Sequence, residues 1–209
     1  LIFMPYFLLK KRFKLIASTL SMLAFGLLLP VIFYGLKKNI IVLKEWQKTL
    51  SQSTPSLLDH YDNASLYAFF LKNVSGPKGL AVTFIISFAL LICFIFLWMM
   101  VLAKKRNLEK PEVLELSFLF ILIPLFSPLA WYYNYLYSAL AVAFLLNSIG
   151  RFPLFHRVVL IANFFAVGAS LREILEKQAF RFYTQHALVV VSYLIILAYL
   201  FYSRAKNYS

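Results

Sequence analysis

Three titratable residues stand close together in one polar stretch of the sequence: Asp59, His60 and Asp62. A carboxylate beside an imidazole can transfer protons or bind a metal ion. The same residues are also typical of a solvated loop before a helix, with Asp62 or Asn63 as the helix cap. For His60, proton transfer, a phosphate contact and a plain loop position all remain open. The chain has no Cys and His spacing typical of a metal centre, so we predict no metal site.

A second stretch is aromatic and follows Pro128 directly. It holds Trp131, Tyr132, Tyr133, Tyr135 and Tyr137, with Asn134 among them. Aromatic faces can stack on sugar rings, and phenols together with Asn134 could hold sugar hydroxyls. An aromatic belt at the membrane–water interface would have the same composition without any binding role.

Basic residues further along the chain, Arg172, Lys177 and Arg181, form a third candidate cluster. Guanidinium groups bind phosphate in a bidentate way, so this cluster could hold a lipid phosphate. Anchoring to lipid headgroups is the alternative. The chain has no Gly-rich nucleotide loop and no nucleophile elbow, so no cofactor is identifiable from its motifs.

The composition decides what kind of protein must position these residues. Hydrophobic residues make up 62% of the 209-residue chain and charged residues only 14%. Both values lie far from those of soluble domains, which excludes a soluble or disordered protein and predicts a membrane protein. The net charge of +13 comes largely from Lys and Arg at the ends of apolar runs. That placement is typical of membrane anchoring, and we expect no nucleic-acid partner.

Apolar runs predict an all-α, polytopic transmembrane helical bundle, because a membrane-crossing helix needs about 20 apolar residues. Charge-free candidates are 15–36, 80–102 and 187–203, while 158–171 is either a short span or a re-entrant segment, and 1–9 resembles the end of a truncated span. The run 116–150 is too long for one span, so we expect a hairpin that breaks near Ser127-Pro128. About six to seven spans result, in a single transmembrane domain covering 1–209.

Basic residues also predict the orientation of the bundle, since Lys and Arg in short loops stay in the cytoplasm. The segments 10–14 and 104–110 are basic, whereas 127–134 carries no charge. We therefore expect 127–134 outside and the C-terminus in the cytoplasm, unless 158–171 is re-entrant. We expect Glu112 and Glu115 to face the inner membrane interface.

The segment 37–79 is then an extracytoplasmic loop with interfacial helices. An amphipathic stretch with Ile40, Leu43 and Trp46, with lysines in between, is typical of a helix lying in the headgroup plane. After a break at Ser53-Thr54-Pro55 we expect a second short helix over 65–72.

Two of these stretches resemble a known family. Asn63-Ala64-Ser65-Leu66 resembles the N-Q-S-L signature of glycosyltransferase family 87, and Ser127 to Asn134 resembles its S-P-x-S-W-x-H-H element. The family comprises GT-C-type, polyprenol-phosphate-mannose-dependent mannosyltransferases with many spans. The chain departs from the family at Ala64, Ala130, Tyr133 and Asn134, of which the last two occupy the histidine positions. Contacts made by those histidines would be lost or changed here.

The resemblance implies a hexosyltransferase that moves a hexose, with mannose expected, from a polyprenyl-phosphate sugar to a lipid or glycan acceptor. It implies an integral protein of a bacterial plasma membrane whose substrate site lies on the extracytoplasmic side. The residues it implies for substrate binding are Asp62, Asn63, Ser65, Ser127, Pro128, Trp131, Tyr133 and Asn134, with His60 and Arg172 as candidate phosphate contacts. The family's catalytic carboxylate lies in the first outer loop, so we expect it upstream of residue 1 and expect this chain to be a C-terminal part.

Two other functions fit the same sequence. A lipid or solute transporter would place charged groups near the bilayer midplane at broken helices, where this chain has almost none. A non-catalytic membrane subunit would need no site at all. Membrane lipids are expected partners in each case.

Overall fold

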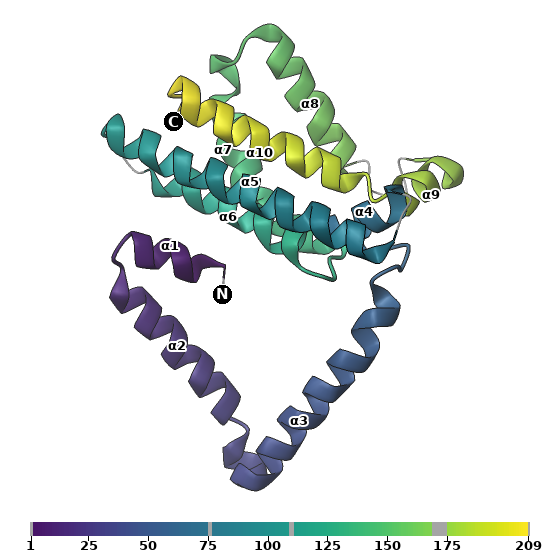
Figure 1. The fold of residues 1–209 in the computed structure, drawn as a ribbon. Helices are drawn as coiled ribbons and strands as arrows, with labels where there is room; N and C mark the ends of the chain where they lie inside the picture. The colour runs from purple at the N-terminus through teal and green to yellow at the C-terminus, as the bar shows by residue number, and fades with distance from the viewer. Residues whose placement is uncertain (1, 75–76, 109–110, 169–174, 209) are drawn as a thin grey trace. The chain divides into compact units, whose positions relative to one another are not determined.

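The computed structural model describes residues 2–74, 77–108, 111–168 and 175–208, and every regular element in these ranges is helical (Figure 1). The all-α class predicted from the sequence is therefore confirmed. The chain divides into two compact units, Leu1–Ser56 and Leu57–Ser209.

The first unit contains α1 (Phe3–Leu9), α2 (Phe13–Leu28) and most of α3 (Val31–Leu57). The axes of α2 and α3 differ by 88°. Pro30 begins the break because a proline has no N–H for the helix ladder. Gly35 extends the break with a φ of 73°, a value that glycine adopts readily. The expectation of one straight helix over 15–36 is wrong for this reason. The expected break at Ser53-Thr54-Pro55 is also absent, since α3 continues to Leu57.

The second unit is built around α10 (Val189–Lys206), which packs against α5 (Lys78–Lys105), α6 (Glu112–Phe126), α7 (Ala139–Ser148) and α8 (Leu154–Gly168). Apolar side chains fill the space between these helices. Phe118, Leu125, Ile196 and Leu200 are buried there. Two short helices, α4 (Leu66–Asn73) and α9 (Lys177–Gln185), lie at the end of this bundle where α6 ends (Figure 1).

Among the residues that the structure describes, two helices are long and apolar enough to cross a membrane: Gly79–Lys105 and Val189–Lys206. The bent pair α2 and α3 would make a third candidate span. These helices are compatible with an integral membrane protein. The helix α6 ends at Phe126, where the sequence predicted the hairpin to break. A 3-10 helix, η1 (Tyr132–Ser138), then leads into α7.

At the opposite end of the second unit, Glu115 and Arg204 are both fully buried, with 0% of each residue exposed. The Arg204 guanidinium donates to the Pro111 carbonyl at 2.8 Å, and Arg106 donates to the Arg204 carbonyl at 3.0 Å. These bonds join the ends of α5, α6 and α10. The expectation that Glu115 faces the membrane interface is therefore wrong, because α10 and its neighbours cover this part of α6.

Candidate functional site

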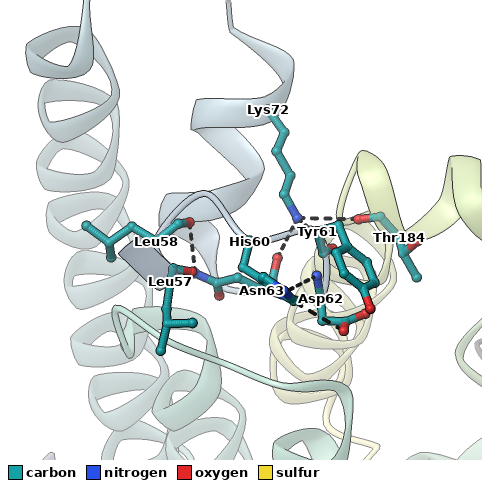
Figure 2. A network of polar contacts seen from close by, with 8 residues as sticks. All are labelled: Leu57, Leu58, His60, Tyr61, Asp62, Asn63, Lys72 and Thr184. Atoms are coloured by element: carbon teal, nitrogen blue, oxygen red, sulfur yellow. Dashed lines mark hydrogen bonds and ion pairs between the residues drawn. The ribbon is translucent and has the colours of Figure 1, made fainter. Parts of the chain in front are cut away.

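Asn63 is the centre of a buried hydrogen-bond network (Figure 2). Its amide nitrogen donates to the carbonyls of Leu58 at 3.0 Å and Pro128 at 3.1 Å, with the Leu57 carbonyl at 3.5 Å. Its amide oxygen accepts from the backbone N–H groups of Ser65 and Ala130, both at 3.1 Å. Both N–H donors and the carbonyl oxygen of the amide are therefore engaged with the backbone.

Further bonds join the same two segments of the chain. The backbone N–H of Ala64 donates to the Ala130 carbonyl at 2.6 Å. The buried phenol of Tyr135 donates to the Ala64 carbonyl at 2.8 Å. The two stretches that resemble family motifs, 63–66 and 127–134, are therefore one hydrogen-bonded unit. We refer to this unit as the Asn63 junction.

Ser65 gives the junction its connection to α4. Its hydroxyl accepts from the Ala68 N–H at 3.1 Å and donates to the Pro128 carbonyl at 3.3 Å. Ser65 is thus the N-cap of α4, which runs Leu66–Asn73. The expectation that Asn63 or Asp62 caps this helix is wrong, since the Asn63 side chain is engaged across the junction instead.

Lys72 ties the junction to the last helices of the unit. Its ammonium donates to the carbonyls of Tyr61 at 2.9 Å, Asn63 at 2.8 Å and Thr184 at 3.4 Å (Figure 2). Partial burial lowers the pKa of Lys72 to about 8, although the carboxylates of Asp59 and Asp62 act in the opposite direction. One side chain therefore joins α4, the 61–63 loop and α9.

A polar cavity of about 430 Å³ opens beside this loop. Its walls are Tyr61, Asp62, Lys177, Phe180, Arg181 and Thr184. Lys177 and Arg181 are four residues apart on α9 and so share one face of that helix. Two cations face one carboxylate here, and aromatic side chains complete the wall. This arrangement suits an anion that also carries hydroxyl groups.

His60 and Trp131 meet at the edge of the junction, with ring centroids 5.8 Å apart and an edge-on geometry. The Nδ1 atom of His60 accepts the Asp62 N–H at 3.3 Å, which places the proton of the neutral ring on Nε2. The Asp62 carboxylate lies 4.0 Å from Nδ1. Within the described residues no group of three His, Cys, Asp or Glu side chains is placed to hold a metal ion.

Tyr132 contributes a phenol that lies against Tyr183, with ring centroids 6.3 Å apart. Among the described residues its hydroxyl has no hydrogen-bond partner, although the oxygen is buried. Burial raises the pKa of Tyr132, and burial also raises the pKa of Tyr183 to about 12. Both phenols therefore stay protonated at neutral pH, and the Tyr183 hydroxyl donates to the Ala166 carbonyl at 3.3 Å.

The structure brings some of the predicted site residues together and separates others. Asn63, Ser65 and Pro128 lie inside the junction, and the Ser127 hydroxyl donates to the Leu129 carbonyl within the hairpin turn at 2.7 Å. Asp62 lines the polar cavity and Trp131 lies against His60. Asn134 is half-buried in η1, while Tyr133 is 73% exposed and borders a separate groove with Tyr132 and Tyr193. Arg172 lies outside the described residues.

Three residues that take part in this region are not among those predicted for substrate binding: Lys72, Ala130 and Tyr135. Ala130 contributes only backbone atoms, so its residue type carries no signal. Lys72 resembled an ordinary helix-end lysine and Tyr135 an ordinary belt aromatic. Lys72 and Tyr135 act on backbone carbonyls whose positions depend on the fold.

Comparisons of the chain with protein-family models, with curated proteins and with solved structures give no match.

Proposed function

We propose that the chain is part of a membrane glycosyltransferase. It would move a hexose, with mannose expected, from a polyprenyl-phosphate sugar to a lipid or glycan acceptor. The observation that carries the proposal is the Asn63 junction. Two stretches that resemble one family's motifs are separated by 65 residues, and the Asn63 amide bonds directly to the Pro128 carbonyl. The polar cavity opens beside them.

The charges of the cavity suit a sugar phosphate. Lys177 and Arg181 would bind the phosphate, because charge-assisted hydrogen bonds to phosphate oxygens are among the strongest in proteins. Asp62 would accept hydrogen bonds from sugar hydroxyls, and the Tyr61 and Phe180 rings would cover the apolar face of the sugar. Arg181 takes the phosphate role in this proposal because it lines the cavity.

The transfer exchanges one C–O bond at the anomeric carbon for another. The acceptor hydroxyl oxygen attacks the anomeric carbon, the bond from that carbon to the phosphate oxygen breaks, and a base takes the hydroxyl proton. The leaving polyprenyl phosphate gains one negative charge, which Lys177 and Arg181 would stabilise. We assign the base to no residue of this chain.

In addition to the helices long enough to span, α6, α7 joined to η1, and α8 would cross a thinned or locally distorted bilayer as shorter spans. The bundle would then have about six to seven spans in a plasma membrane of bacterial type. The C-terminus would be cytoplasmic and the cavity would lie on the extracytoplasmic side.

The test is a transfer assay on membranes that contain the complete protein and labelled polyprenyl-phosphate mannose. The double variant Lys177→Ala and Arg181→Ala should lower transfer at least ~10-fold, because two phosphate contacts are lost. Lys206→Ala removes an exposed lysine of α10 and should leave the rate unchanged. Transfer that survives the double variant would remove the cavity from the reaction. The absence of transfer from every polyprenyl-phosphate sugar would remove the enzyme proposal.

Transport of a lipid or solute is a second candidate function, and the burial of Glu115 and Arg204 favours it. Charged side chains inside membrane segments are costly and often belong to transport pathways. Uptake into proteoliposomes, lost in Glu115→Gln, would support transport. We rank it second because Arg204 already bonds to the Pro111 carbonyl between helix ends, where it stabilises the bundle.

A further inference from the structure

The helix α3 carries two different faces in its middle part. Lys37, Lys44 and Lys48 share one side of the helix, since their spacings of seven and four residues match whole turns. Leu43, Trp46 and Leu50 share the other side by the same reasoning, with Trp46 60% exposed. Within its own unit, the apolar side is therefore only partly covered.

Asn39 fixes the corner between α2 and α3. It is buried, with 2% of the residue exposed, and its amide donates to the Leu27 carbonyl at 3.0 Å. Leu27 is in the last turn of α2, where helix carbonyls have no donor from their own helix. The bond from Asn39 satisfies one of them across the break at Pro30. It joins residues 12 positions apart and holds the two axes at the observed angle.

The same bond shows which face of α3 looks toward α2. Asn39 precedes Leu43 by four residues and Trp46 by seven, so all three lie on one side of α3. Because Asn39 reaches to α2, the apolar side of α3 is the side on which α2 lies. The lysine side points the opposite way.

The angle between α2 and α3 determines how the pair can lie in a membrane. The two axes differ by 88°, so if α2 crosses the bilayer, α3 lies parallel to the membrane surface. Its apolar side then faces the hydrocarbon into which α2 descends, and its lysine side faces the headgroups and water. The angle and the helix faces thus agree on one orientation.

We propose that α3 is an interfacial helix that binds anionic phospholipid headgroups through Lys37, Lys44 and Lys48, with Asn39 as the residue that positions it. The charges between 37 and 48 argue for lipid, since this stretch holds four lysines and one glutamate beside a strip of partly exposed apolar side chains. An acidic groove of a protein partner is the other occupant to be tested. The proposal does not depend on the transfer reaction.

Site-directed spin labelling of the complete protein tests the orientation. Single cysteines are placed at positions 37–50 of a Cys93→Ser background, and the protein is reconstituted into vesicles of phosphatidylglycerol and phosphatidylcholine. We expect oxygen accessibility to peak at 43, 46 and 50, and accessibility to a water-soluble nickel chelate to peak at 37, 44 and 48. High oxygen accessibility on all sides would instead place α3 inside the hydrocarbon, and high nickel accessibility on all sides would place it in water or against a soluble partner. Either result overturns the proposal.

Two sets of variants separate the lipid partner from the positioning residue. In the unchanged protein we expect the accessibility pattern to be stronger in vesicles with phosphatidylglycerol than in vesicles without it. The variant with Lys37, Lys44 and Lys48 each changed to Gln should keep the periodic pattern and lose this difference between the two kinds of vesicle. Asn39→Ala should reduce the contrast between the two faces several-fold in both kinds of vesicle. Thr49→Ala is the control, because the Thr49 hydroxyl bonds only back to the Glu45 carbonyl of its own helix. A wild-type pattern that is the same in pure phosphatidylcholine would contradict the anionic lipid partner, and an unchanged pattern in Asn39→Ala would contradict the positioning role.

Discussion

The amide nitrogen of Asn63 lies 3.1 Å from the carbonyl oxygen of Pro128, across 65 residues of sequence. The same side chain accepts the Ala130 N–H, so one asparagine holds the hairpin turn after α6 to the start of α4. The loop beside the polar cavity is held in this way by hydrogen bonds between one side chain and the backbone.

Asn63→Ala should destabilise the second unit by about 2–4 kcal/mol, because the Leu58 carbonyl and two N–H groups lose their partner in a buried place and the Pro128 carbonyl keeps only the Ser65 hydroxyl. Asn63→Asp should be at least as harmful, since a carboxylate oxygen would face those carbonyls. The measurement is the thermal unfolding midpoint of the purified protein in detergent. Asn147→Ala, at an exposed asparagine of α7, is the matched control, and an equal midpoint for both alanine variants would contradict the role of Asn63.

Tyr135→Phe tests a single bond of the same junction. Tyr135 is buried, donates to the Ala64 carbonyl at 2.8 Å and stacks on Tyr193 with centroids 3.9 Å apart. The variant keeps the stacked ring and removes only the hydroxyl, so we expect a loss of about 1–2 kcal/mol in the free energy of unfolding. Tyr133→Phe removes a hydroxyl from an exposed ring and should change nothing. If both variants unfold at the wild-type midpoint, the Tyr135 bond contributes no stability.

Lys72 should titrate at lower pH than an ordinary lysine, near pH 8, because burial opposes its charged form. The folded state then binds fewer protons than the unfolded state between about pH 8 and the ordinary lysine value near 10.5. Within that window the contribution of Lys72 to the free energy of unfolding rises with pH. Below it, the unfavourable effect of burying the charge is fully present.

Pulsed acylation at a series of pH values, read by mass spectrometry, checks the Lys72 titration. The pH profile of the Lys72 reaction should have its midpoint near 8, well below the ordinary lysine value of 10.5. Reading the midpoint rather than the rate removes the effect of partial burial on reagent access. A midpoint at the ordinary lysine value would show that Lys72 is solvated.

The sequence predicted the helices better than their bends. Hydropathy identifies the apolar residues of 15–36 but carries no information on the direction of the helix axis. Pro30 and Gly35 change that direction inside the run. The end of α6 was predictable because the hairpin break rests on the local signal of Ser127-Pro128. The burial of Glu115 was not, because it depends on α10, which lies far along the chain.

For the candidate site, too, the sequence predicted local features better than contacts between distant segments. The resemblance indicated that 63–66 and 127–134 belong to one site, and the two stretches do meet. It did not indicate that Asn63 and Ser65 bond to the backbone of the hairpin turn. A polar side chain in a loop can face a ligand or its own backbone, and only the folded chain determines which. The polar cavity therefore relies on Asp62 and on residues of α9.

Trp131 is a predicted site residue at the edge of the junction, where it is half-buried and meets His60 edge-on at 5.8 Å. If the chain transfers a hexose as proposed, Trp131→Ala removes the ring that would stack on the sugar, and transfer should fall at least ~10-fold. Trp131→Phe keeps an aromatic face and should retain a measurable part of the rate.

Trp98→Ala, at an exposed position of α5, controls for the loss of a membrane-facing tryptophan. Membrane insertion, followed by extraction and gel filtration, should be the same for all three variants. A normally inserted Trp131→Ala protein with wild-type transfer would remove this residue from the site and leave the polar cavity as the place where the sugar binds.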